Sequence, residues 1–452
     1  MEAKGGHSML SDWDPADSPS SLTRRLLDDT RNPNVVWSLD PYPALVTASA
    51  NELLVRRSHL RSGELVQELR ELDAIRVGSM LEGLSLSNED RDRFDVDLYR
   101  LEGDAFAAVE RLRRRLVIDG RSPLVSPHHV LVPSNWAHCP AGPPTATQAP
   151  VLIEPFDPNE SVDVVVIDSG YIEHPVLHAR GGLASRQGQY LAPDGRWTPE
   201  PPDGLDVSPT DGLVDAIAGH GTFIAGLVAT GCSRAKMTIV GHRHIDLTAT
   251  TELAVARSIC ASASLGSTWT RAHGLVISCG YAFATQGCAP SIAFEAALSF
   301  LAQVNPGAVL VAPAGNEAVD APQWPAAFRS VGYTNVVGVG SLTRCGTKIA
   351  DFSNRGDWVD CFAIGEDVIS THITTRQPMA PEERPQLKQL FTGWSEWSGT
   401  SFAAPKVAAA IAAGVRPGVA PIDAAEELLE TAPRIPNGGG NGGTAADLAV
   451  LG

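Results

Sequence analysis

Three short glycine-containing motifs carry the side chains of this chain that could do chemistry. They read VVVIDSG at 164–170, GHGTFIAG at 219–226 and SGTSFAAP at 398–405. Together they offer a carboxylate (Asp168), an imidazole (His220) and a hydroxyl (Ser401). A serine hydroxyl attacks a carbonyl when an imidazole takes its proton, and a carboxylate can hold that imidazole in the productive tautomer. The three motifs therefore indicate acyl-transfer chemistry.

Each motif taken alone also has a simpler interpretation. An aspartate after a strand is commonly a turn or cap residue, and a histidine between glycines can be a cap or core residue. A serine before an alanine-rich stretch is a common helix cap. These interpretations do not explain why all three residue types occur in the order Asp168, His220, Ser401, each beside glycines that permit close backbone approach. The combination favours the catalytic interpretation.

The elements that must position these residues have the pattern of an α/β fold. From residue 162 onward, short apolar runs at 164–167, 238–240, 275–278, 308–312 and 336–339 alternate with helical stretches. Such a pattern predicts a doubly wound, mostly parallel sheet with helices on both faces. In this architecture functional groups gather at the carboxyl ends of strands, where Asp168 is predicted to lie. Two insertions, 182–215 and 374–394, could shape access to the site.

The rest of the chain divides by composition. Residues 1–45 predict an irregular leader, and residues 133–160 a proline-rich linker. Between them, residues 46–132 predict a small α+β unit whose order is strand, helix, one or two strands, helix, strand, with Ser62 and Asp104 as helix caps. That order is ferredoxin-like. Residues 161–435 would form the catalytic domain, and 436–452 a flexible glycine-rich tail.

The combination of DSG, GHGT and GTSFAAP resembles the subtilisin-like serine peptidases, the subtilase family. The resemblance covers about 162–432 and implies a catalytic triad of Asp168, His220 and Ser401. It also implies that Asn316, in the segment VLVAPAGNE at 309–317, donates a hydrogen bond to the oxyanion. The expected function is that of a serine endopeptidase working through an acyl-enzyme.

The resemblance further implies a substrate-binding strand. Its backbone would be that of Ser278, Cys279 and Gly280, where the family usually has Ser-Leu-Gly. Cys279 would be either a thiol that makes the enzyme thiol-sensitive or, as we prefer, a buried inert one. Glu317 could lie at the pocket rim, although a solvated surface carboxylate is the preferred interpretation. A cis bond at Trp324–Pro325 is also expected by resemblance.

The unit at 46–132 looks like the family's inhibitory propeptide in position and element order. We expect it to dock on the active-site face with the following segment in the cleft, and self-cleavage within about 135–160 to release the enzyme. The alternative is a stable regulatory domain that is never removed. Two other functions stay open: a pseudoprotease that binds peptides, and hydrolysis or transfer of esters and cyclised peptides.

Composition limits partners and location. The 52 acidic residues against 35 basic ones give a net charge of −17, which disfavours nucleic acid and anionic membranes as partners. No apolar run suggests a signal or a membrane span, and the seven cysteines have no C-x-x-C spacing. We therefore expect free thiols and a cytoplasmic location, with non-classical export left open.

No cofactor is expected for the chemistry. Acidic residues in the first insertion could form a calcium loop, but they lack EF-hand spacing, so a solvated loop is preferred. Those residues are Asp203, Asp206, Asp211 and Asp215. His242 and His244 alternate on a strand-like segment but lack further metal ligands, so no metal site is predicted.

Overall fold

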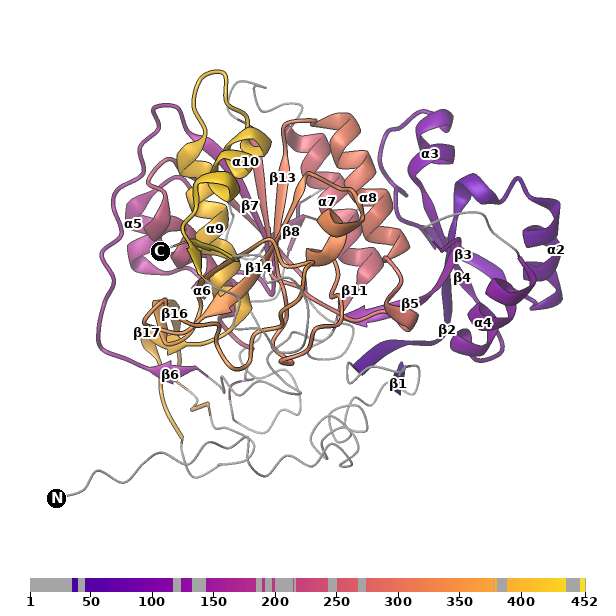
Figure 1. The fold of residues 1–452 in the computed structure, drawn as a ribbon, viewed down its shortest axis with the longest axis horizontal. Helices are drawn as coiled ribbons and strands as arrows, with labels where there is room; N and C mark the ends of the chain where they lie inside the picture. The colour runs from indigo at the N-terminus through magenta and orange to yellow at the C-terminus, as the bar shows by residue number, and fades with distance from the viewer. Residues whose placement is uncertain are drawn as a thin grey trace.

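The structure is a computed structural model. It describes residues 35–39, 45–116, 123–131, 144–183, 189–191, 197–199, 214, 217–242, 250–266, 274–376, 378–379, 388–435 and 448–451. Within these ranges the chain forms an α/β unit and a smaller N-terminal unit, which lies against the side where helices α7 and α8 are found (Figure 1).

The α/β unit is built on one sheet with the strand order β10-β7-β12-β13-β14-β15-β19-β18. Neighbouring strands are parallel except β18 and β19. Their bounds are β7 Val162–Asp168, β10 Ala235–Gly241, β12 Leu275–Cys279, β13 Val309–Pro313, β14 Val336–Leu342, β15 Cys361–Ile364, β18 Arg434–Ile435 and β19 Leu448–Leu451. The predicted doubly wound, mostly parallel sheet is confirmed.

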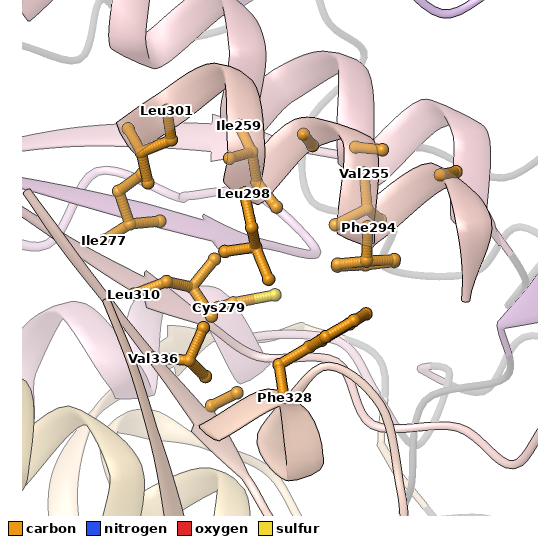
Figure 2. Packing of buried hydrophobic residues seen from close by; sticks show 14 of the residues in the cluster. Val255, Ile259, Ile277, Cys279, Phe294, Leu298, Leu301, Leu310, Phe328 and Val336 are labelled. Atoms are coloured by element: carbon orange, nitrogen blue, oxygen red, sulfur yellow. The ribbon is translucent and has the colours of Figure 1, made fainter. Parts of the chain in front are cut away.

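Helices cover both faces because successive strand side chains point in opposite directions. Val165 and Ile167 of β7 enter one buried cluster, and Val164 and Val166 enter another on the opposite face. The first face is covered by α7 (Glu252–Gly266) and α8 (Ile292–Val304), whose packing against the strands is shown in Figure 2. The second is covered by α6 (His220–Gly231), α9 (Thr400–Gly414) and α10 (Pro421–Thr431).

Smaller elements surround this core. Helix α5 (Pro175–Arg180) follows β7, and the described part of the first insertion contains a hairpin of β8 (Gln189–Leu191) and β9 (Trp197–Pro199). The second insertion extends the hairpin of β16 (Val368–Thr374) and β17 (Thr392–Trp397). The short strand β6 (Thr145–Ala146), from the linker, adds to the free edge of β17.

The N-terminal unit has the predicted ferredoxin-like topology. Its antiparallel sheet has the order β5-β2-β4-β3. The elements are β2 Leu45–Arg56, α2 Gly63–Glu71, β3 Ile75–Ser79, α3 Asn88–Phe94, β4 Val96–Arg100, α4 Ala105–Arg115 and β5 Val125–Leu131. Ser62 is the N-cap residue of α2, and the Asp104 side chain caps α4 by accepting from the Ala107 N–H at 2.7 Å. The additional helix α3 was not expected.

Two sequence predictions about the ends of the chain are wrong in part. The sequence predicts an irregular leader over residues 1–45, but Val35–Leu39 forms strand β1, antiparallel to β2. The run VVWSL is rich in β-branched and aromatic residues, which favour strands. In the predicted flexible tail, Leu448–Leu451 forms β19, which extends the main sheet beside β15. The sequence does not show which strand lies at the edge of the sheet, so it cannot predict that a short apolar run will pair there.

The two units share one hydrophobic core. Leu81 and Phe94 of the N-terminal unit belong to the same buried cluster as Val255 of α7 and Phe294 of α8. The Phe94 ring packs edge-on against Phe300 of α8, with 5.8 Å between ring centroids. Burial of this apolar surface stabilises the docking of the two units.

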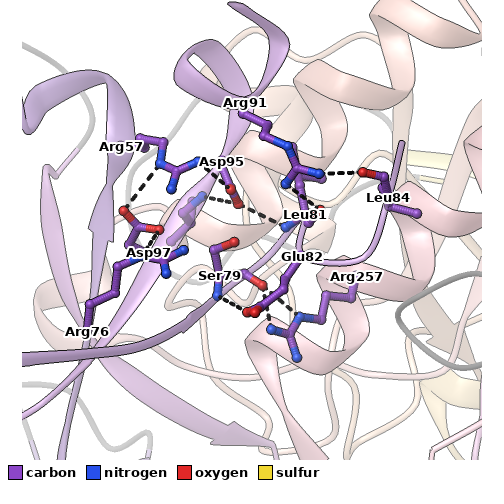
Figure 3. A network of polar contacts seen from close by, with 11 residues as sticks. Arg57, Arg76, Ser79, Leu81, Glu82, Leu84, Arg91, Asp95, Asp97 and Arg257 are labelled. Atoms are coloured by element: carbon purple, nitrogen blue, oxygen red, sulfur yellow. Dashed lines mark hydrogen bonds and ion pairs between the residues drawn. The ribbon is translucent and has the colours of Figure 1, made fainter. Parts of the chain in front are cut away.

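Backbone and polar contacts cross the same interface. Strand β5 pairs with the two-residue strand β11 (Thr250–Thr251), which leads directly into α7. Arg257 of α7 donates to the carbonyl of Ser79, beside the Arg–Asp network of the N-terminal unit in Figure 3. At the start of α7, the fully buried Glu252 accepts from the His129 backbone N–H at 3.0 Å and from its Nδ1 at 2.7 Å.

Two compositional expectations can be compared with the structure. Six described cysteines are free thiols, while Cys139 lies outside the described residues. The cytoplasmic location itself stays a prediction.

One helical stretch of the described chain, Gln286–Val304, is long and apolar enough to cross a membrane, with a mean hydropathy of 1.3. Its Phe294 and Leu298 are fully buried in the core, so its apolar character is that of a core helix.

Candidate active site

Asp168 is the last residue of β7 and is buried beneath the site. Its Oδ1 accepts a hydrogen bond from the Ser169 backbone N–H at 2.7 Å and lies 2.7 Å from His220 Nδ1. An ionised carboxylate accepts only, so Nδ1 must carry the proton in this contact. The lone pair of His220 is therefore on Nε2, which is the arrangement that a general base needs.

His220 is the first residue of α6, and the glycines on both sides of it are required by close packing. Gly219 has φ 85°, in the left-handed region, and a Cβ there would lie 2.8 Å from His372 Nε2. A Cβ on Gly221 would lie 2.1 Å from the carbonyl oxygen of Gly170. A larger residue would push the start of α6 away from β16 at position 219, or away from the turn after β7 at position 221, and so displace the imidazole from Asp168.

Ser401 lies in the first turn of α9 and is almost fully buried. Its neighbour Phe402 packs on the His220 ring, with 5.2 Å between ring centroids, and Trp397 packs edge-on against the same ring at 5.4 Å. The first turn of a helix presents backbone N–H groups and the positive end of the helix dipole. The residue that follows Ser401 thus contacts the imidazole, and Ser401 itself lies at a helix end that stabilises negative charge.

Asn316 is oriented by the residue that precedes Ser401. Its Oδ1 accepts from the Thr400 backbone N–H at 2.8 Å and from Thr400 Oγ1 at 2.9 Å. Thr400 Oγ1 also accepts from the Gly315 backbone N–H at 3.1 Å. Because its carbonyl oxygen is held by Thr400, the carboxamide presents its N–H₂ group away from Thr400. Four sequence-predicted residues, distant in the chain, therefore meet at one end of the sheet.

The predicted substrate-binding segment lies at the end of β12. Ser278 has sheet neighbours on both sides, Val166 and Val311, so an added peptide strand could continue only from the end of β12. Gly280 packs directly on the site, since a Cβ there would lie 1.7 Å from Asp168 Oδ2. Cys279 points into the core (Figure 2), and burial raises its pKa to about 12. This supports the inert-thiol interpretation.

Glu317 is not the solvated carboxylate that we preferred from the sequence. Its Oε2 accepts from Asn354 Nδ2 at 2.7 Å, and burial raises the pKa of its carboxyl group. The error arises because the partner, Asn354, lies 37 positions away in the sequence. The expected cis bond at Trp324–Pro325 is confirmed.

Sequence analysis overlooked one histidine near the site. His372, on β16, is buried under Gly219, and burial lowers its pKa to about 3. His242, on which a metal role was weighed, instead packs edge-on against Tyr281 and donates its backbone N–H to the Asp168 carbonyl at 2.8 Å. The sequence gives no signal for the contact between His372 and Gly219, because a single histidine in a strand does not show which segment packs on it.

No group of three or more His, Cys, Asp or Glu side chains that could hold a metal occurs in the part of the chain that the structure describes. The acidic residues weighed as a calcium loop and His244 lie outside the described residues. The expectation that the chemistry needs no cofactor stays a prediction.

The fold and the contacts above define a doubly wound α/β protein with an Asp–His–Ser arrangement at one end of its sheet. The model of the Subtilase family matches residues 159–445, and the chain belongs to this family. The interpretation of the sequence as a subtilisin-like serine peptidase is thereby confirmed.

Individual relatives are distant. A thermophilic serine proteinase from Bacillus sp. (strain AK1) is 32% identical over 131 residues, which are 29% of this chain and 27% of that protein. Subtilisin BL from Lederbergia lenta is 26% identical over 59% of this chain and 80% of its own length. The crystal structure of fervidolysin from Fervidobacterium pennivorans, described as a keratinolytic enzyme related to subtilisin, aligns with 89% of this chain and 60% of its own. Its TM-score is 0.53 at 19% identity, a similarity of fold.

Proposed function

We propose that this chain is a serine endopeptidase in which Ser401 is the nucleophile, His220 the general base and Asp168 the group that orients it. The contact of His220 Nδ1 with Asp168 Oδ1 at 2.7 Å carries the proposal. Ser401 Oγ attacks the scissile carbonyl while His220 Nε2 takes its proton. His220 then protonates the leaving amine, and water hydrolyses the acyl-enzyme. Peptides or proteins are the substrates.

The oxyanion of the tetrahedral intermediate would be bound by two donors. One is the Asn316 side-chain amide, whose orientation is fixed by Thr400. The other is the Ser401 backbone N–H in the first turn of α9. Donors that are already in place when charge develops need no rearrangement, and loss of one typically costs about 10²–10³ in turnover.

A fluorophosphonate reagent tests this function, because it labels an activated serine. We expect the wild-type chain to be labelled and to hydrolyse peptides, and the Ser401→Ala variant to do neither. A chain that is neither labelled nor active would contradict the proposal and favour a peptide-binding role. Mass analysis of the products separates hydrolysis from transfer to another nucleophile.

We further propose that the N-terminal unit inhibits the enzyme until the linker is cut. Two contacts support this. Strand β5 ends at Leu131, paired with Thr250, and β6 begins at Thr145, paired with Glu396 of β17, which leads into Ser401. The chain therefore leaves the N-terminal unit at a strand paired with the α/β unit, and it is paired again at β17, the strand that leads into Ser401.

Self-cleavage can be tested by intact mass. We expect wild-type protein to be cut within residues 135–143, the part of the expected range that precedes the paired strand β6, whereas Ser401→Ala should keep its full length. If both proteins have the same full-length mass while wild type still hydrolyses peptides, the N-terminal unit is a stable regulatory domain.

A further inference from the structure

The linker strand β6 is held along both of its edges. On one edge it pairs with β17, with Ala146 opposite Ser395 and the Thr147 N–H donating to the Trp394 carbonyl at 3.3 Å. On the other edge lies the side chain of Gln389, from the second insertion. The pairing of β6 with β17 alone would leave this second edge of β6 open to solvent.

Gln389 acts there as a neighbouring peptide group would. Its Oε1 accepts from the Ala146 N–H at 2.8 Å, and its Nε2 donates to the Pro144 carbonyl at 2.6 Å. In an extended chain, the carbonyl of one residue and the N–H of the residue two positions later point to the same side. The carboxamide therefore recognises extended backbone, whatever the side chains are.

The position of Gln389 is fixed by contacts within the second insertion as well as by the linker. Its backbone makes a two-way bridge with Met379, with both N–H···O distances at 2.9 Å. Met379 and Phe391 are fully buried in a small cluster with Ile373, and Ala146 packs against that cluster. The backbone of Gln389 is thus held by contacts that do not involve the linker, and a residue held in this way lowers the entropic cost of binding a peptide.

The direction of the strand relates this surface to the site. Because β6 is antiparallel to β17, its N-terminal end faces the C-terminal end of β17 at Trp397, close to Ser401. A bond cut in 135–143 leaves residues 144–148 on the amine product. The surface therefore lies on the leaving-group side of the scissile bond.

We propose that the backbone of Trp394–Glu396 and the side chain of Gln389, here named the leaving-side strip, bind the extended polypeptide that follows the scissile bond. This inference rests on the proposed peptidase function. The linker occupies the strip first, and substrate polypeptide occupies it after processing. The preferred substrates are accordingly extended chains that continue well beyond the cleaved bond, bound by strand addition. Gln389 is a substrate-positioning residue.

The first experiment uses the linker as substrate. We expect the full-length chain carrying Gln389→Ala to cut its own linker about tenfold more slowly than wild type, because two hydrogen bonds of ordinary strength are lost. Ala146→Pro removes the N–H that Gln389 accepts and should slow the cut similarly. Gln303→Ala changes an exposed glutamine at the end of α8 and serves as the matched control. Cleavage by Gln389→Ala at the wild-type rate would overturn the proposal.

The second experiment uses added peptides and the self-processed protein. One peptide continues ten residues beyond the cleaved bond, and the other ends at a nitroanilide. The ratio of kcat/KM for the long peptide to that for the short one should fall about tenfold in Gln389→Ala, mainly through KM. An unchanged ratio would refute the strip while leaving the peptidase function intact. Absence of both hydrolysis and fluorophosphonate labelling in wild type would instead refute the peptidase function.

Discussion

Substitution of Gly280 by alanine is a direct test of how tightly the candidate triad is packed. A Cβ at this position would lie 1.7 Å from Asp168 Oδ2, whereas side-chain contacts of this kind are rarely below 3.0 Å. Asp168 or β12 must therefore move by about 3.0 − 1.7 = 1.3 Å. Gly280 is not at a positive φ, so alanine adds this steric contact without backbone strain.

A shift of this size should be costly for catalysis. The other oxygen of the same carboxylate holds His220 at 2.7 Å, so the imidazole will be displaced or lose its partner. Displacement of a catalytic group by about 1 Å can cost about 10²-fold in rate. We expect Gly280→Ala to lower both kcat for a reporter peptide and the rate of fluorophosphonate labelling by about that factor.

Two controls separate a catalytic effect from a folding effect. Gly103→Ala adds a Cβ where no atom lies within 4 Å and should leave the labelling rate unchanged. Asp168→Asn removes the charge that Gly280→Ala displaces, so the double variant should be little slower than Asp168→Asn alone. If Gly280→Ala labels at the wild-type rate and melts at the wild-type temperature, the contact between His220 and Asp168 is not what limits catalysis.

Two further predictions concern stability and are best measured by urea unfolding in the Ser401→Ala background, where self-cleavage is absent. Burial keeps His372 neutral, with a pKa of about 3, so between pH 6.5 and 3 the unfolded chain takes up a proton that the folded chain does not. The free energy of unfolding should therefore decrease by up to about 1.4 kcal/mol for each unit by which the pH is lowered through this range. His372→Leu should reduce that slope, and equal slopes in the two proteins would refute the low pKa of His372. His129→Ala leaves Glu252 buried without its imidazole partner, and loss of one member of such a pair costs about 3–5 kcal/mol. Arg61→Ala is the comparison, because the ion pair of Arg61 with Asp92 is exposed. If His129→Ala lowers the free energy of unfolding no more than Arg61→Ala does, the contact between His129 and Glu252 does not hold the N-terminal unit.

Sequence analysis predicted the local framework of the site well. Asp168 was expected at the carboxyl end of a strand, and it is the last residue of β7. Asp104 was expected to cap a helix and does so. These features depend on residues close together in the chain, where strand alternation, glycine and capping residues act directly.

The errors concern contacts between distant segments. Glu317 is held by Asn354, and the segment Leu448–Leu451, expected to be flexible, adds to β15. Helix α3 went unpredicted because its sequence, NEDRDRF, is polar apart from Phe94, which packs against a ring from the other unit. None of these partners could be identified from spacing along the chain.

By itself the sequence determined which residues could react and the order in which strands, helices and their glycine turns follow one another. Such properties are local, since they depend on backbone conformation and side-chain periodicity over a few residues. Only the tertiary structure decided that Cys279 faces the core, that His372 lies under the turn before His220, and that Gln389 contacts the linker 245 positions away. Those outcomes depend on strand register and on which surfaces pack together, because close packing selects partners by shape and distance rather than by sequence separation.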